Sequence, residues 1–459
     1  MMKQKYLYYT VPFLGTIFCL WYIFAATCDG IYSDYVRLVN SYLPNVFDPG
    51  LFFVPDILTR IPINYLARII NVTFFDYNIM FDRVLGVMAL GLSGAVITGY
   101  CVRKKLSYGW FLVLMAVFFS LNKWEMLNNG SGFAHFLSFA LFYCHYEVLD
   151  RLWNGDDCFR DRIYLIVLPF ITTLLVAGPY CAIYSVTVLL ACIVMFLLKR
   201  RKLGIWPIIY GICTLVPFLL YLWSNHYAVE DHDASATVSL LTQLMDTPGF
   251  FVRFFVKSFS SMVIEGERAE EIFRTNAPFL IMGLIVIALY VLALWYNWYY
   301  RLYEETILPV ILIMSGVLNH VLIVLARWIF LKENYGLSSR YALQFQTGIL
   351  GIILTFALLF RKRRYRIGSG VKLAAGITCF VFLTGNCYTT YTEVKKAPHR
   401  KAAYEQRAEL ALRFEQVTDE ELRANFEYRL GREDSGQKVR SALTILKENG
   451  YSVFREGNQ

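Results

Sequence analysis

Residues 340–360 read RYALQFQTGILGIILTFALLF, and residues 361–364 read RKRR. After Arg340 the run contains no charged residue, and its remaining 20 positions are enough for a helix to cross a bilayer core of about 30 Å. A basic cluster directly after such a run is typical of the cytoplasmic end of a membrane-spanning helix. The stretch therefore predicts one span and also its direction.

The same pattern recurs along the chain. The apolar runs are 6–27, 84–102, 108–121, 132–149, 163–177, 180–198, 205–224, 277–296, 307–328, 340–360 and 370–388. Residues 163–198 form one long stretch, which we divide at Gly178-Pro179 because this dipeptide favours a turn. The runs predict about eleven transmembrane helices, and the expected fold class is an all-α polytopic membrane protein.

Composition supports this class. The 459 residues are 57% hydrophobic and 17% charged, with a mean hydropathy of +0.45, whereas soluble domains carry roughly 25% charged residues. The strands of a β-barrel alternate polar and apolar residues, so unbroken apolar runs disfavour that fold. The ten cysteines are scattered along the chain and do not indicate a disulfide scaffold.

The net charge of +9 is concentrated in short loops, and it predicts topology rather than a nucleic-acid partner. With eleven spans, the basic clusters 103–105, 199–202 and 361–364 all fall on one side. We expect a multi-pass protein of the cell (plasma or inner) membrane, with a cytoplasmic N-terminus and an extracytoplasmic C-terminus. Glycine-rich phosphate loops are absent from the sequence, and we predict no cofactor.

This topology places every long connection outside the cytoplasm. We predict a transmembrane domain over 1–388, with outer loops 28–83 and 225–276, and a small extracytoplasmic helical domain over 389–459. The first outer loop has apolar residues at helical spacing in two segments, 33–43 and 57–70, as expected of helices lying in the membrane interface. Thr418 and Glu421 in the tail have the spacing of a helix capping box.

The second outer loop contains the polar string Glu230-Asp231-His232-Asp233. Carboxylates and imidazole can bind a metal. Adjacent residues on a polar stretch are more often simply solvated, however, so we predict no metal site. Residues 250–259 of the same loop are strongly apolar and predict an interfacial or re-entrant segment.

Ionisable residues at the membrane boundary are costly, which makes them functional candidates. Asp29 and Asp34 follow the first span, and either carboxylate could serve as a catalytic base. Arg83 opens the second span, while Arg327 and Arg340 flank the ninth and tenth spans, and a guanidinium group is well matched to phosphate. The alternatives are that Asp29 caps a helix and that the arginines extend harmlessly to the interface.

Three further polar residues lie beside the predicted outer ends of spans. They are Glu125, His135 and Tyr341, which we treat as candidate acceptor-binding residues. The pair Asp156-Asp157 is predicted on the cytoplasmic side, and we give it no role.

The arrangement resembles integral-membrane glycosyltransferases of the GT-C fold, in particular bacterial enzymes that modify cell-envelope polysaccharides, such as O-antigen glucosyltransferases. The resemblance is carried by an Asp just beyond the first span, a long first outer loop with interfacial helices, and a C-terminal outer domain. Many members have an Asp-Asp or Asp-Glu pair after the first span. This chain has Cys28-Asp29-Gly30 instead, and Asp34 is the next acidic residue.

The resemblance implies transfer of a sugar from a polyprenyl-phosphate carrier to a glycan acceptor at the outer face. Asp29 would be the general base, with Asp34 as its neighbour or substitute. Arg340, Arg83 or Arg327 would hold the donor phosphate. The expected partners are therefore the lipid-linked sugar, the glycan acceptor and the lipid bilayer.

Two other functions compete with this interpretation. A polysaccharide polymerase or ligase would use the same donor, with essential arginines in loop 225–276. A lipid-linked sugar flippase or transporter would show internal repeats and helices broken at the membrane midplane. The sequence shows no clear repeat, and its polar groups gather at one predicted face. The transferase is the favoured prediction.

Overall fold

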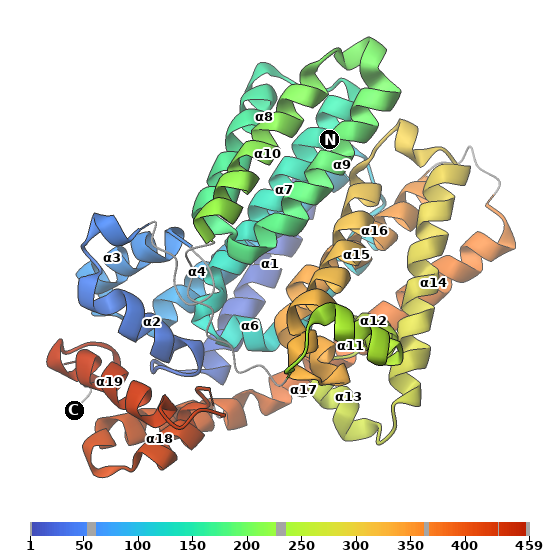
Figure 1. Ribbon diagram of the computed structural model, residues 1–459. Coiled ribbons are helices and arrows are strands. Elements are labelled where there is room, and N and C mark those ends of the chain that lie inside the picture. The colour runs from blue at the N-terminus through green and yellow to red at the C-terminus, as the bar shows by residue number, and fades with distance from the viewer. Residues whose placement is uncertain (1, 53–60, 226–235, 362–366, 430, 456–459) are drawn as a thin grey trace.

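The computed structural model describes residues 2–52, 61–225, 236–361, 367–429 and 431–455. All regular elements within these ranges are helices. Figure 1 shows long helices assembled into a bundle, with shorter helices gathered below it. The polar string 230–233 and the first part of the predicted helix 57–70 lie outside the described residues.

The bundle is built from eleven of the helices. They are α1 (Met2–Ala26), α4 (Ile79–Arg103), α5 (Tyr108–Phe118), α7 (Phe133–Asn154), α8 (Phe159–Ile171), α9 (Cys181–Leu203), α10 (Trp206–Asn225), α14 (Ala277–Tyr299), α15 (Leu308–Arg327), α16 (Ala342–Arg361) and α17 (Ser369–Leu412). Nine segments of the described chain are long and apolar enough to cross a membrane, which supports the predicted class of polytopic helical membrane protein.

The helices α7 and α8 are not among these nine segments. Helix α7 carries Glu147, Asp150 and Arg151 near its end. Helix α8 has only 13 residues and leads into a π-helical turn at Thr172–Val176. A 3₁₀ turn at Gly178–Tyr180 then precedes α9, so the predicted division of 163–198 is confirmed.

The helix α16, from which the sequence analysis began, lies at the centre of the bundle. Its apolar window is 94% buried, which explains why it is apolar on every side. Two glycines permit close approach of its neighbours. A Cβ atom on Gly348 would lie 2.0 Å from the Tyr290 hydroxyl oxygen, and one on Gly316 would lie 2.5 Å from the Gly348 Cα.

One end of the bundle carries the short connections 104–107, 155–158, 204–205 and 300–307, and we call it the basic end. Asp150 is fully buried there. Its carboxylate accepts hydrogen bonds from Arg103 at 2.7 Å, from the Thr306 hydroxyl at 2.6 Å and from the Ile307 backbone N–H at 2.8 Å. Asp150 therefore joins α4 and α7 to the start of α15.

The opposite end, which we call the cap end, is covered by α2 (Asp34–Tyr42), α3 (Ile63–Phe75), α18 (Asp419–Phe426) and α19 (Ser435–Glu448). These helices share a separate apolar core that includes Tyr35, Val39 and Leu443. The Thr418 hydroxyl accepts a bond from the Glu421 N–H, which confirms the predicted cap of α18. Helix α17 runs unbroken through residues 388 and 389, so the C-terminal segment continues directly from the last long helix.

The connection between α10 and α14 also lies at the cap end. It contains α11 (Leu240–Asp246), α12 (Pro248–Ser260) and α13 (Gly266–Ile272). The helix α12 covers the apolar segment predicted at 250–259, and it packs against α14 and the 3₁₀ helix η9 (Glu333–Leu337).

Candidate functional site

A polar cavity of about 450 Å³ opens at the cap end. The connection before α2, the short helix α6 (Trp124–Asn128), the α12–α13 region, η9, the 3₁₀ helix η10 (Ser339–Tyr341) and the residue after α18 all contribute to it. Its lining combines four carboxylates, one guanidinium and three aromatic rings with small polar groups. The residues are Tyr32, Trp124, Glu125, Glu265, Gly266, Glu270, Asn334, Tyr335, Leu337, Ser338, Ser339, Arg340 and Glu427.

Arg340 and Glu125 form an ion pair on one side of this cavity. The Arg340 Nε donates to Glu125 Oε1. The hydroxyls of Ser338 and Ser339 donate to the other Glu125 oxygen, at 3.1 and 3.2 Å. Three donors from one short segment thus fix the Glu125 carboxylate and the guanidinium beside it.

A second polar group comes from the starts of α2 and α7 and from the 3₁₀ turn before α9. Asp34 interacts electrostatically with Arg340, and also with His135 and Tyr180. The rings of His135 and Tyr180 meet edge to face, with their centres 4.6 Å apart. Arg340 therefore pairs with Glu125 of α6 and interacts electrostatically with Asp34 of α2.

Arg327 and Tyr341 belong to the same neighbourhood. The Arg327 guanidinium carbon lies 6.0 Å from the centre of the Tyr341 ring. Both residues are within electrostatic reach of Tyr180, and Tyr341 is also within reach of Arg340. Two cationic groups, Arg327 and Arg340, thus approach one set of tyrosines.

Two buried polar groups of this neighbourhood make no hydrogen bond of standard geometry within the described residues. They are the side-chain amide of Gln344, which is 1% exposed, and the Nε of Arg327. Gln344 is nevertheless in reach of the Tyr180 hydroxyl, and the Arg327 guanidinium is in reach of the Tyr341 hydroxyl. Buried polar atoms in folded proteins are nearly always paired. Gln344 beside Tyr180 and Arg327 beside Tyr341 therefore retain hydrogen-bonding capacity for a polar ligand.

Asp29 has different surroundings. Its carboxylate accepts bonds from the Ile79 N–H at 2.9 Å, the Ser452 hydroxyl at 3.2 Å and Arg455 at 2.5 Å. Burial raises the pKa of the Asp29 carboxyl, and the bonds from Ile79 and Arg455 offset only part of this effect. Asp29 connects the start of α4 to the C-terminal segment, and it is not among the residues lining the polar cavity.

Arg83 is likewise directed toward the backbone. Its Nε donates to the Asn128 carbonyl at 2.7 Å, and one terminal nitrogen donates to the Cys28 carbonyl at 2.6 Å. The guanidinium carbon lies 5.0 Å from the centre of the Tyr404 ring. Arg83 therefore links α4 to the segment after α1 and to α6, and it does not line the polar cavity.

Of the predicted site residues, Glu125 and Arg340 line the polar cavity, while Asp34, His135, Arg327 and Tyr341 lie outside its lining and are linked to Arg340, or to one another, through electrostatic interactions and Tyr180. Asp29 and Arg83 lie within structural joints instead. Sequence reasoning did not single out Tyr180, Gln344, Trp124, Glu265, Glu270 or Glu427. Tyr180 follows the Gly178-Pro179 dipeptide, which we interpreted only as a turn. Glu427 comes from the tail and carries no local signal of a site.

No protein-family model, curated protein or solved structure gave a significant match to this chain. Among the described residues, no group of three or more His, Cys, Asp or Glu side chains is arranged to hold a metal ion. The functional assignment therefore depends on the chemistry of the polar cavity and its surroundings.

Proposed function

We propose that this protein is a membrane glycosyltransferase that moves a sugar from a polyprenyl-phosphate carrier to a cell-envelope glycan or a similar hydroxyl acceptor. One observation carries the proposal. Arg340 forms an ion pair with Glu125 and interacts electrostatically with Asp34, at the edge of a cavity lined with acidic and aromatic side chains. This combination suits a substrate with a phosphate at one end and hydroxyl groups at the other.

The donor phosphate is assigned to Arg327 and Arg340. As the bond between the anomeric carbon and the phosphate oxygen breaks, negative charge grows on the departing lipid phosphate. Guanidinium groups hydrogen-bond phosphate oxygens and stabilise that charge most strongly where water is excluded. The Nε of Arg327 has no hydrogen-bond partner in the described residues, while the same guanidinium interacts with the Tyr341 hydroxyl.

The proton of the acceptor is assigned to Asp34. The acceptor oxygen forms a bond to the anomeric carbon while its proton passes to a carboxylate within hydrogen-bond reach. Asp29 already accepts three hydrogen bonds in the structure, one of them from Arg455. Asp34 is nearer to the arginine that would hold the donor, so we prefer it to Asp29 as the base.

The sugar is assigned to the polar cavity. Carboxylates accept hydrogen bonds from hydroxyl groups, and aromatic rings offer apolar faces to the C–H groups of a sugar ring. Glu265, Glu270 and Glu427 supply the first kind of group, while Trp124 and Tyr335 supply the second. The excess of carboxylates favours an uncharged sugar over an anionic one.

An apolar groove supports a lipid-linked donor. A cavity of about 600 Å³ lies between α1, α5 and α17, lined by Leu14, Phe18 and Met115 among others. It reaches Ser120, and four residues later in the chain Trp124 lines the polar cavity. A hydrocarbon tail in this groove would place its phosphate toward the cap end.

The decisive experiment compares Asp34→Asn with Asp29→Asn in proteoliposomes supplied with a polyprenyl-phosphate sugar and a glycan acceptor. We expect Asp34→Asn to lower the transfer rate by about 10²- to 10⁴-fold, the usual contribution of a general base. Folded Asp29→Asn should retain most of the wild-type rate. Normal transfer by Asp34→Asn would exclude the proposed base.

A further inference from the structure

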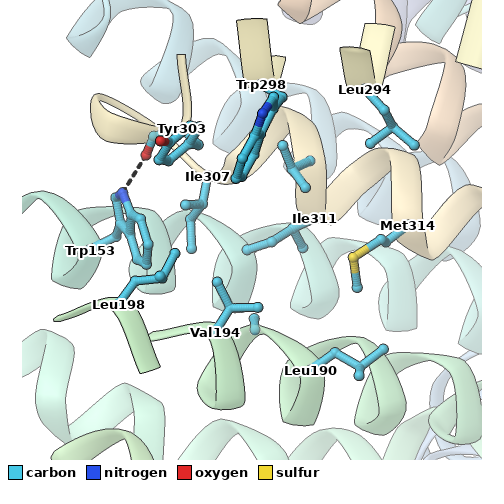
Figure 2. A pocket seen from close by; sticks show the side chains of 12 residues that line it. Trp153, Leu190, Val194, Leu198, Leu294, Trp298, Tyr303, Ile307, Ile311 and Met314 are labelled. Atoms are coloured by element: carbon cyan, nitrogen blue, oxygen red, sulfur yellow. Dashed lines mark hydrogen bonds between the residues drawn. The ribbon is translucent and has the colours of Figure 1, made fainter. Parts of the chain in front are cut away.

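A third cavity lies toward the basic end of the bundle, away from the polar site. Its volume is about 240 Å³, and its lining is almost entirely apolar. Figure 2 shows Leu190, Val194 and Leu198 of α9 facing Ile311 and Met314 of α15 across it. The cavity therefore lies between α9 and the pair α14–α15.

Aromatic residues form one end of this cavity. The Trp153 indole N–H donates to the Tyr303 carbonyl at 2.6 Å, and the rings of Trp298 and Tyr303 stack with centres 5.4 Å apart. Tryptophan and tyrosine are enriched where the hydrocarbon of a membrane meets its head groups. Trp153 and Trp298 lie at the ends of α7 and α14, and Tyr303 lies in the short connection 300–307 after α14, all at the basic end.

Positive charge adjoins the aromatic end. The Lys199 ammonium lies 4.7 Å from the centre of the Trp153 ring, and Lys199 directly follows Leu198 of the cavity wall. Lys202 approaches the same connection, since a Cβ atom on Gly155 would lie 3.3 Å from its ammonium nitrogen. The acidic residue nearest in sequence to Tyr303 is Glu304, which pairs with Arg301 at 3.7 Å.

We propose that this cavity binds one acyl chain of an anionic phospholipid, whose phosphate contacts Lys199. Basic pockets between transmembrane helices are suited to anionic head groups, and the apolar walls suit a hydrocarbon chain. The occupant is a bilayer lipid and not the sugar carrier, because the arginines assigned to the carrier phosphate lie at the cap end. The bound lipid fills the space between α9 and α14–α15 and so stabilises their packing.

The test measures lipid binding to the full-length protein in detergent, by native mass spectrometry and by thermal unfolding. The probes are phosphatidylglycerol and phosphatidylcholine with identical acyl chains. We expect the wild type to prefer phosphatidylglycerol, and Lys199→Gln to lose about fivefold of that preference, the equivalent of about 1 kcal/mol for one basic group. Lys372→Gln, on α17 and outside the cavity, is the control and should keep the wild-type preference.

A second variant tests whether the acyl chain occupies the apolar part of the cavity. Val194→Trp fills the cavity and should abolish retention of both phospholipids. Leu284→Trp, on a 56% exposed position of α14 outside the cavity lining, should retain them. Equal binding of both phospholipids by the wild type, or full selectivity in Lys199→Gln, would overturn the proposal. Retention of polyprenyl phosphate, offered as a third probe, without retention of either phospholipid would also overturn the proposal. Sugar transfer is scored separately, so either proposal can fail without the other.

Discussion

Arg340 and Glu125 are 215 positions apart in the chain, yet their side chains form one ion pair at the edge of the polar cavity. The pair joins α6 to the segment that precedes α16, and Ser338 and Ser339 hold its carboxylate in place. This contact orients the guanidinium group that we assign to the donor phosphate.

The pair predicts unequal effects of two substitutions. Arg340→Ala should lower the transfer rate by about 10²- to 10³-fold, because a preorganised donor to the developing charge is lost. Glu125→Gln keeps the shape and removes the negative charge that orients Arg340, so its loss should be smaller. Initial rates in proteoliposomes measure both. Equal rates for Arg340→Ala and wild type would contradict the assignment of Arg340.

Replacing Gln344 by an apolar residue should raise the stability of the protein and lower its activity. Its amide is buried with no hydrogen bond of standard geometry in the described residues, and its interaction with the Tyr180 hydroxyl offsets only part of a burial cost of about 1–3 kcal/mol. Gln344→Leu removes that cost and should raise the midpoint of thermal unfolding while lowering kcat/KM for the lipid-linked donor. Gln346→Leu is the control, because the Gln346 amide nitrogen donates to the Val117 carbonyl at 2.5 Å, although its amide oxygen has no partner in the described residues. That substitution should destabilise the protein.

Asp29 and Arg455 should contribute to stability rather than to transfer. Asp29→Ala leaves the Ile79 N–H at the start of α4 without its acceptor and separates the C-terminal segment from α4. We expect a loss of about 1–2 kcal/mol in the free energy of unfolding. A double-mutant cycle with Arg455→Ala measures the coupling, and additive effects would show that the two residues act independently.

Among the carboxylates at the basic end, we expect replacement of Asp150 to cause the largest loss in the free energy of unfolding. Asp150→Ala removes the buried acceptor at the start of α15 and one of the two carboxylates that pair with Arg103, the other being Glu147, and we expect a loss of about 3 kcal/mol in the free energy of unfolding. Asp157→Ala is the matched control, because Asp157 pairs with Arg162, whose side chain is 45% exposed. Exposed pairs contribute about 0–1 kcal/mol. Similar losses from both would contradict this account.

Glu333 predicts a pH dependence at the cap end. Burial opposes its ionisation, but hydrogen bonds from Arg253 and Lys257 outweigh burial and lower the pKa of Glu333. A carboxyl group whose pKa is lower in the folded state stabilises the protein above its ordinary pKa of about 4.5, and this contribution is lost as the pH falls through the lowered value. Asn276 and Asn334 also contact Lys257.

The measurement is the midpoint of thermal unfolding for wild type and Glu333→Gln between pH 3 and 7. The wild type should be more stable near neutral pH, and the difference should shrink as the pH falls below about 4.5. A difference that stays constant across this range would show that the carboxylate charge is not responsible.

Much of the architecture could be predicted because it depends on consecutive residues. The run at 340–360 became the enclosed helix α16, and the Gly178-Pro179 dipeptide divided α8 from α9 as expected. The number of spans was harder to predict: the sequence indicates about eleven, whereas nine segments of the described chain are long and apolar enough to cross a membrane. Charged residues near the end of α7 lower its mean hydropathy. The structure shows that Asp150 of this helix is satisfied internally by Arg103 and the start of α15.

The membrane class followed from the sequence by itself, because long apolar runs and their flanking charges are local properties of the chain. The composition of the site did not follow in the same way. Asp29 and Asp34 are five positions apart and look equivalent beside the first span. Only tertiary packing directs Asp29 toward Ile79 and Arg455 and brings Asp34 near Arg340. Contacts between helices far apart in the chain decide that Asp34, and not Asp29, interacts with Arg340. No local sequence pattern encodes those contacts.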